Sequence, residues 1–231
     1  MNSNSSPSDL KITDMRVVSI AGAPMRSTLI RLDTNQGIYG LGEVRDGASH
    51  IYALQLKRQL LGENPCNVDK VFRKIKQFGW HARQAGGVCG VEMALMDLAG
   101  KAHGVPCYQL AGGKFRDQIR TYCDTPTTAD AEEMGNRLKK RMDDGFTFLK
   151  MDIGVRLLKD IPGTVSYPAG MLETNQVMHP LTGIQFTDKG IEALVEYVET
   201  VRNIVGYEIP LAADHFGHIN VESCIRLARA L

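Results

Sequence analysis

Two opposite charges stand one residue apart in an apolar, strand-forming stretch of the chain. Lys150 and Asp152 belong to the run FTFLKMDIG, residues 146–154, which a glycine precedes and a glycine ends. Because side chains alternate along a strand, both charges project from one face and Met151 from the other. Removing a lysine and an aspartate from water is costly unless they pair or serve a function. Taken alone, these residues fit a structural ion pair and a catalytic pair equally well.

Polar residues also end other apolar stretches of the same half of the chain. Asp124 follows one short stretch directly, and Asp214 and His215 stand at the end of another. In (β/α)8 barrels the active site lies at the carboxyl ends of the strands. Polar side chains at successive strand ends therefore favour a functional interpretation of Lys150 and Asp214.

The elements that must position these residues fall into two groups. Residues 10–116 predict an α+β domain, with antiparallel strands at 11–20, 27–33 and 38–44 followed by helices. The clearest helix, 88–103, has apolar residues at a 3–4 spacing and ends before a glycine. After the third strand comes a polar loop, 45–50, which could bind a polar ligand but is more simply explained as a solvated loop.

Residues 117–231 predict an α/β domain. Strand and helix alternate three times, with strands expected at 119–123, 146–153 and 210–214, and an insertion between 155 and 189. Such alternation is typical of parallel βα units, in an open sheet or a (β/α)8 barrel. No strand is followed by a G-x-G-x-x-G or G-x-S-x-G motif, which argues against a nucleotide-binding domain and an α/β-hydrolase.

Composition excludes several classes of function. The chain has 231 residues, 43% hydrophobic and 23% charged, and a net charge of +1, so neither disorder nor nucleic-acid binding is indicated. No apolar run approaches the length of a membrane span, which predicts no membrane partner and a cytoplasmic protein. Residues 1–9 are polar and predict a disordered leader. The odd number of scattered cysteines indicates free thiols: Cys66, Cys89, Cys107, Cys123 and Cys224.

Longer motifs carry a family resemblance. The helix and its tail, residues 90–101 and 104–113, are similar to the cap helix, Gly-x-Pro turn and Leu-x-Gly-Gly linker of one enzyme family. Residues 145–152 are similar to that family's second barrel strand, and 211–214 to its third. The chain thus resembles the enolase superfamily, in its mandelate racemase/muconate lactonizing enzyme branch.

The resemblance implies a cap domain followed by a (β/α)8 barrel, an Mg²⁺ cofactor, and abstraction of the proton α to the carboxylate of a small-molecule acid. Lys150 matches the first lysine of the family's Lys-x-Lys motif, and Asp214 matches the first Mg²⁺ ligand. Two loops, residues 21–26 and 45–50, match the cap loops that select substrate in the family. The second of them contains Arg45 and His50. Assembly into a homo-oligomer is also expected.

The chain departs from the family pattern at Asp152, where the second lysine would stand. A neighbouring carboxylate favours the charged form of Lys150, which suits electrostatic stabilisation or proton donation better than a basic role. Asp152 is then a weak base or a partner that orients Lys150. This favours a one-directional dehydration over a two-base racemisation, and the polar cap loops fit a sugar acid. His215 and His218 are further candidates for the acid or for substrate contacts.

Length leaves the barrel incomplete, because a (β/α)8 barrel takes about 250 residues and only the first three units are expected here. Two hypotheses follow. The chain is either the N-terminal portion of an acid-sugar dehydratase, with a racemase or cycloisomerase as the alternative, or an inactive remnant that lacks most metal ligands.

Overall fold

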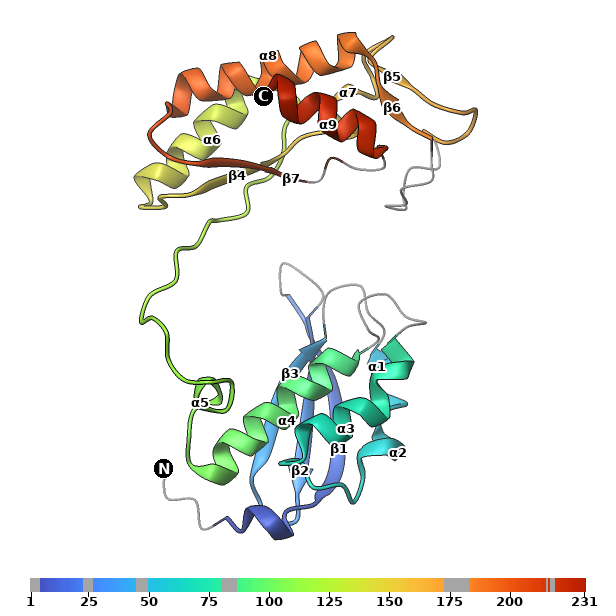
Figure 1. Ribbon diagram of the computed structural model, residues 1–231, viewed down its shortest axis with the longest axis vertical. Coiled ribbons are helices and arrows are strands. Elements are labelled where there is room, and N and C mark those ends of the chain that lie inside the picture. The colour runs from blue at the N-terminus through green and yellow to red at the C-terminus, as the bar shows by residue number, and fades with distance from the viewer. Residues whose placement is uncertain are drawn as a thin grey trace. The chain divides into compact units, whose positions relative to one another are not determined.

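The computed structural model describes residues 5–22, 27–44, 50–79, 87–172, 183–214, 216 and 219–231. The chain divides into two compact units, Met1–Asp117 and Gln118–Leu231. In each unit helices pack on a β-sheet, which is antiparallel in the first and parallel in the second (Figure 1).

The sheet of the first unit is the predicted antiparallel meander. Its strands are β1 (Ile12–Ile20), β2 (Ser27–Thr34) and β3 (Tyr39–Val44), in the order β1-β2-β3. Burial alternates strictly along β2, because alternate side chains of a strand point to opposite faces. Gly37, with φ 78°, supplies the left-handed conformation required by the turn between β2 and β3.

Helix α4 (Val88–His103) covers one face of this sheet and confirms the helix expected from the apolar spacing. Gly104, at φ 68°, ends it with the expected left-handed cap. The other helices of the unit are short: α1 (His50–Leu54), α2 (Lys57–Leu60), α3 (Val68–Ile75), the 3-10 turn η2 (Lys76–Gly79) and α5 (Cys107–Leu110). A single apolar core joins β1–β3 with α1–α4.

Glycines let β3 and α4 approach closely. A Cβ on Gly42 would stand 1.8 Å from the carbonyl oxygen of Gly90, and one on Gly40 would stand 2.2 Å from that of Ala94. Both distances are impossible for real atoms, so this helix–strand contact requires glycine at these positions. The Gly-x-Gly sequence of β3, residues 40–42, is thus required by packing within the first unit.

The expected disordered leader is wrong for residues 5–9. Pro7–Asp9 form a 3-10 turn, η1. Side-chain amides hold it: Gln36 Oε1 accepts from the backbone N–H of Ser6 at 2.8 Å, and Asn64 Nδ2 donates to the carbonyl of Pro7 at 2.8 Å. Amide side chains from outside this segment therefore satisfy its backbone groups and order it.

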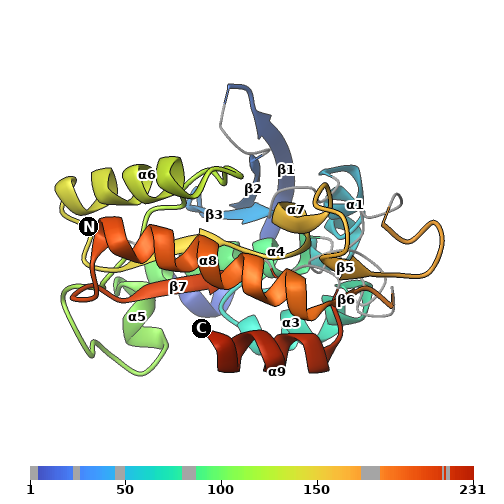
Figure 2. The same ribbon diagram turned by 90° about the horizontal axis from the view of Figure 1, so that it is seen from above.

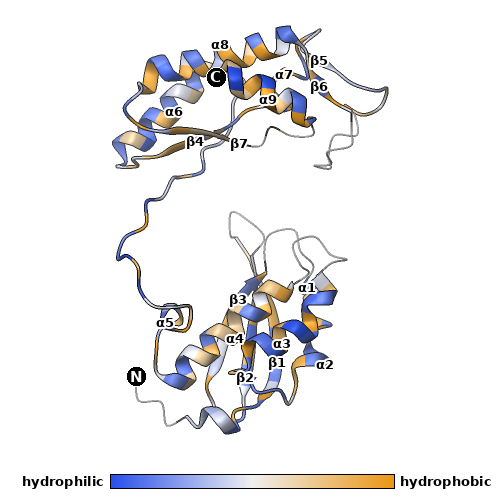
Figure 3. Ribbon diagram, in the orientation of Figure 1, coloured by the Kyte–Doolittle hydropathy of each residue, from blue (hydrophilic) through white to orange (hydrophobic). Residues whose placement is uncertain are grey.

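The second unit contains two parallel strands, β4 (Leu149–Asp152) and β7 (Leu211–Asp214). Helices α6 (Ala131–Asp143) and α8 (Asp188–Val205) lie side by side on one face of the pair, and α9 (Val221–Ala230) lies beside α8 (Figures 1 and 2). Leu149 and Met151 enter the core on this face. Along α8 apolar and polar residues alternate with the helical turn (Figure 3), as expected for a helix half covered by a core.

The region expected as an insertion contains α7 (Val155–Leu158) and a two-stranded antiparallel pair, β5 (Val165–Ser166) and β6 (Gln185–Phe186). Phe186 is 2% exposed and anchors this pair to the core of the unit.

The expected first strand, 119–123, does not form, so two of the three predicted barrel strands pair in the described part of the chain. Ile119 is 76% and Tyr122 49% exposed, so in the observed conformation this segment packs little of its apolar surface against the rest of the unit. Side chains tether it instead: Arg120 donates to the carbonyl and, at 3.0 Å, to the hydroxyl of Thr147.

Among the helices that the structure describes, none combines the length and the apolar character needed to traverse a lipid bilayer.

Candidate active site

The site is built on the carboxyl ends of β4 and β7. The two strands are parallel and in register, so Lys150 lies beside Ala212, and Asp152 beside Asp214. Because Leu149 and Met151 enter the helical core, Lys150 and Asp152 project from the opposite face, as the alternation in sequence predicts. Lys150 is nonetheless a buried residue, 7% exposed.

Three carboxylates surround the ammonium of Lys150. Its Nζ lies 2.7 Å from Asp152 Oδ1, 3.3 Å from Asp124 Oδ1 and 3.5 Å from Asp214 Oδ2. Asp152 approaches most closely and its side chain is 26% exposed, whereas those of Asp214 and Asp124 are 58% and 82% exposed. Asp152 is therefore the principal counter-ion, and the two more exposed carboxylates are screened by solvent.

The contact between Lys150 and Asp152 is an ion pair and not a well-aligned hydrogen bond. Asp152 Oδ1 is buried and has no hydrogen-bond partner of good geometry, although the nitrogen is only 2.7 Å away. Such a contact stabilises the charged form of both groups through their opposite charges.

The carboxylates determine the charge of Lys150. Burial by itself lowers the pKa of this lysine, but the close contacts with Asp152 and Asp124, and their negative charges, raise its pKa above the ordinary value. The side chain therefore remains an ammonium at neutral pH. In that form it can donate a proton or stabilise negative charge, and it cannot act as a base.

Asp124 is the member of this group that the sequence analysis did not assign to the site. It follows the segment that was expected to be a strand, and the one signal that pointed to it was its place after an apolar stretch. Its contact with Lys150 depends on how the segment before α6 is folded, which the order of residues does not specify.

Of the other predicted site residues, His50 is the one that the structure describes. His50 is the first residue of α1 in the first unit and is exposed. Arg45, His215 and His218 lie outside the described residues.

The donor atoms around Lys150 fit part of a magnesium site. Asp214 supplies a partly exposed carboxylate, the type of oxygen ligand that Mg²⁺ prefers. Near-octahedral coordination takes several such ligands, and within the described ranges no group of three or more histidine, cysteine or acidic residues is arranged to hold a metal ion. Asp214 thus fits as one ligand, and a complete site needs others.

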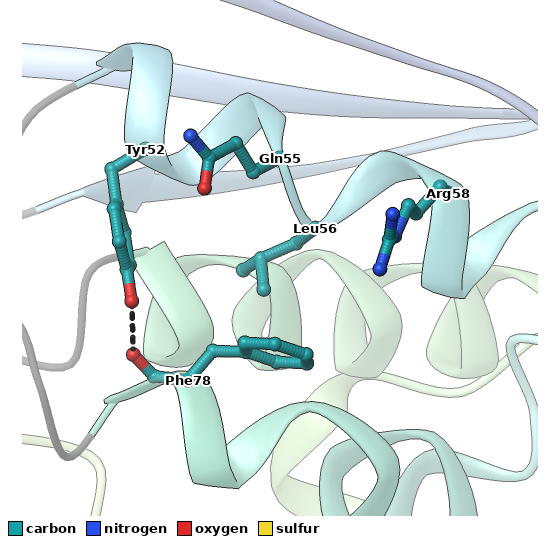
Figure 4. Close-up of a pocket in the computed structure, with 5 residues that line it drawn as sticks. All are labelled: Tyr52, Gln55, Leu56, Arg58 and Phe78. Carbon is teal, nitrogen blue, oxygen red and sulfur yellow. Dashed lines mark hydrogen bonds between the residues drawn. The ribbon is translucent and has the colours of Figure 1, made fainter.

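A separate pocket of about 290 Å³ lies in the first unit (Figure 4). Leu56 and Phe78 form its apolar wall, and Gln55 and Arg58 its polar rim. Tyr52 closes one end by donating from its hydroxyl to the carbonyl of Phe78 at 2.8 Å. This pocket offers no acid–base pair, so the cluster on Lys150 is the better candidate for chemistry.

Comparison with known proteins shows which family the chain is similar to. Residues 12–112 match the family model described as "Mandelate racemase / muconate lactonizing enzyme, N-terminal domain". A solved mandelate racemase/muconate lactonizing enzyme-like protein from Rubrobacter xylanophilus superposes with a TM-score of 0.73 at 30% identity, over 96% of this chain and 58% of that one. The chain is thus similar to the mandelate racemase/muconate lactonizing enzyme branch of the enolase superfamily, with the family model matching most of the first unit.

Curated relatives within the enolase superfamily are named as sugar-acid dehydratases. D-xylonate dehydratase of Haloferax volcanii is 30% identical over 96% of this chain and 52% of its own length. D-galactonate dehydratase of Verminephrobacter eiseniae is 28% identical, again over 96% of this chain and 52% of its own length. The chain therefore spans about half the length of the curated relatives it matches.

These similarities agree with the architecture of both units. The antiparallel meander and α4 fall within the part matched by the N-terminal domain model, and the paired strands β4 and β7 begin an α/β domain. The predicted fold class, an α+β cap followed by the start of a (β/α)8 barrel that is incomplete in this chain, is confirmed.

Proposed function

We propose that this chain contributes to an Mg²⁺-dependent hydro-lyase that removes water from a sugar acid to give a 2-keto-3-deoxy acid. The curated relatives named as D-xylonate and D-galactonate dehydratases support this assignment. The observation that carries it is the Lys150 ammonium, held by carboxylates at the carboxyl ends of two paired strands.

The charge state of Lys150 favours dehydration over racemisation. A racemase of this type needs a base on each face of the α-carbon, and Lys150 remains protonated because Asp152 replaces a second lysine beside it. An ammonium fits a reaction in which one group takes the α-proton and another stabilises charge or donates a proton to the departing hydroxide.

Each residue of the site then has a proposed role. Lys150 stabilises the negative charge that develops on the acid when its α-proton leaves, because a fixed ammonium in a partly dry site acts strongly on nearby charge. Asp152 holds that ammonium in place, and its second oxygen could serve as a weak base. Asp214 is proposed as one Mg²⁺ ligand; a divalent cation, when bound, holds the substrate carboxylate and favours ionisation next to it.

We assign substrate selection to four polar residues outside the Lys150 group. Arg45 and His50 in the cap, and His215 and His218 after β7, are proposed to contact the hydroxyls of the acid. Polar groups of this kind suit a polyhydroxylated substrate better than an apolar one, because unpaired polar groups are costly to bury. A homo-oligomeric assembly and a cytoplasmic location belong to the same proposal, and sedimentation velocity tests the assembly.

The proposal is tested by incubating the protein with Mg²⁺ and a panel of aldonic and aldaric acids, and assaying for 2-keto-3-deoxy products. Formation of such a product from at least one acid is the expected result. Absence of product across the panel would contradict dehydration.

Lys150→Met tests the assignment of the site. The substitution removes the charge and keeps the length of the side chain, so turnover should fall by about a hundredfold to a thousandfold, as it does when a donor that stabilises developing charge is lost. Lys139→Met, on the exposed surface of α6, is the matched control and should retain activity. Near-normal turnover by Lys150→Met, with circular dichroism unchanged, would refute the role of Lys150.

A further inference from the structure

The segment before α6 is held in place without strand pairing. Arg141 Nε donates to the hydroxyl of Thr125 at 3.3 Å, and its Nη2 lies 3.5 Å from the carbonyl oxygen of Asp124. Arg137 donates to the carbonyl of Pro126 at 2.7 Å, and Tyr197 donates to that of Thr128 at 2.7 Å. Side chains of α6 and α8 therefore fix the chain at Asp124 and directly after it.

Within this segment the side chain of Thr125 is buried and that of Asp124 is exposed. Thr125 is 4% exposed, and its hydroxyl also donates to the carbonyl of Cys123 at 3.1 Å. The neighbouring Asp124 side chain remains 82% exposed although Oδ1 lies 3.3 Å from Lys150 Nζ. An anchored backbone thus presents a carboxylate at the site while leaving it accessible.

Asp124 is not needed as a counter-ion for Lys150. Asp152 already lies at 2.7 Å in a much less exposed position, and the contact with Asp124 at 3.3 Å is weakened by solvent because that carboxylate is 82% exposed. The arrangement therefore leaves the Asp124 carboxylate available to a ligand that occupies the site.

We infer that Asp124 is a specificity-determining residue that selects aldonic acids, with one carboxylate, over aldaric acids, with two. This inference rests on the proposed function. Lys150 Nζ is in contact with both Asp214 and Asp124. A sugar acid whose reacting carboxylate lies next to Asp214 and whose carbon chain passes Lys150 presents its far end to Asp124.

The chemistry of that far end decides the selection. An aldonic acid ends in a hydroxyl, which donates to the Asp124 carboxylate in a charge-assisted hydrogen bond. An aldaric acid ends in a second carboxylate, which cannot donate and is repelled by a like charge. Hydrogen bonds to charged groups change affinity by about 10- to 100-fold, so the difference between the two acids should be large.

Matched pairs of acids test the inference, because D-galactonate and galactarate, or D-xylonate and xylarate, differ only at the far end. We expect the wild-type protein with Mg²⁺ to show a kcat/KM at least about tenfold higher for the aldonic member of a pair. In Asp124→Asn and Asp124→Ala this ratio should fall by about tenfold, through a lower value for the aldonate and a higher one for the aldarate. Asp143→Asn, an exposed substitution at the far end of α6, should leave the ratio unchanged.

Each contrary outcome has a separate meaning. Equal losses for both members of a pair would show that Asp124 acts only through Lys150 or the local fold, and would overturn the inference. A wild-type preference for the aldarate, or an unchanged ratio in both Asp124 variants, would overturn it as well. Failure of the wild-type protein to bind or convert any acid would overturn the proposed function, and this inference with it.

Discussion

Lys150 and Asp152 form an ion pair along a single strand, with Nζ and Oδ1 2.7 Å apart. The two residues are separated by Met151, which enters the core on the other face of β4. The pair therefore brings a positive charge into a largely dry position at the end of the strand, and neutralises it locally. This relationship explains how a residue as hydrophilic as lysine is 7% exposed in a short parallel sheet.

Asp152→Ala should destabilise the protein by about 1–3 kcal/mol, because the Lys150 ammonium remains buried while its nearest counter-ion is lost. The partial exposure of Asp152 and the two remaining carboxylates keep the loss below that of a fully buried pair. Urea unfolding followed by circular dichroism measures the change. In a double-mutant cycle Lys150→Met should recover part of the loss; purely additive effects would show that the two side chains do not interact.

Glu63 should make the first unit sensitive to acid. Its side chain is 18% exposed and pairs with Lys70 at 2.9 Å and Lys74 at 3.0 Å, and these hydrogen bonds and charges lower the pKa of Glu63. A carboxyl with a lowered pKa in the folded state adds stability above its unfolded pKa, about 4.3, and this stability is lost as the pH falls through the folded value.

Glu63→Gln should therefore cost about 1 kcal/mol at pH 7 and progressively less below about pH 4. Urea unfolding at pH 7 and again below about pH 4 measures the change in the free energy of unfolding. Asp69→Asn, in an exposed pair with Arg73, is the control and should cost less at pH 7. A Glu63→Gln effect that is the same at both pH values would contradict an electrostatic origin.

Gly42→Ala should destabilise the first unit by about 1–3 kcal/mol through overpacking, because the added methyl would collide with the carbonyl oxygen of Gly90. Leu41→Ala is the matched control from the same strand. Its side chain is 45% exposed on the opposite face, so its loss should change stability by no more than about 0.5 kcal/mol. Thermal unfolding compares the two variants. Equal effects would mean that α4 shifts to accommodate the methyl group.

The outer edge of β3 is capped by α4. Asp97 Oδ2 accepts from the backbone N–H of Leu41 at 2.9 Å, and Lys101 Nζ donates to the carbonyl of Tyr39 at 2.8 Å. These bonds satisfy groups of an edge strand that could otherwise pair with another chain. The double substitution Asp97→Ala/Lys101→Ala should thus increase concentration-dependent self-association in sedimentation velocity, whereas Asp97→Asn, which keeps an acceptor, should not. An unchanged sedimentation profile of the double variant would show that the edge is protected in another way.

Much of the fold follows from local patterns. The alternation of apolar residues in β2, the 3–4 spacing of α4 and the glycine after its end specify these elements wherever they pack. The same reasoning missed η1 and expected a strand at 119–123, because the outcome at both places depends on partners distant in the chain. Gln36 and Asn64 order the first segment, and Arg120 tethers the second to Thr147 without strand pairing.

By itself, the sequence determined that Lys150 and Asp152 share a face of one strand, since side-chain alternation is a local property of the backbone. It also supplied the motifs that identify the family. Only the tertiary structure decided that Asp214 lies in register beside Asp152, and that Asp124, from a segment without strand structure, reaches the same ammonium. Strand pairing and side-chain tethers join residues far apart in the chain, and these long-range contacts, which no local pattern encodes, place three carboxylates around one lysine.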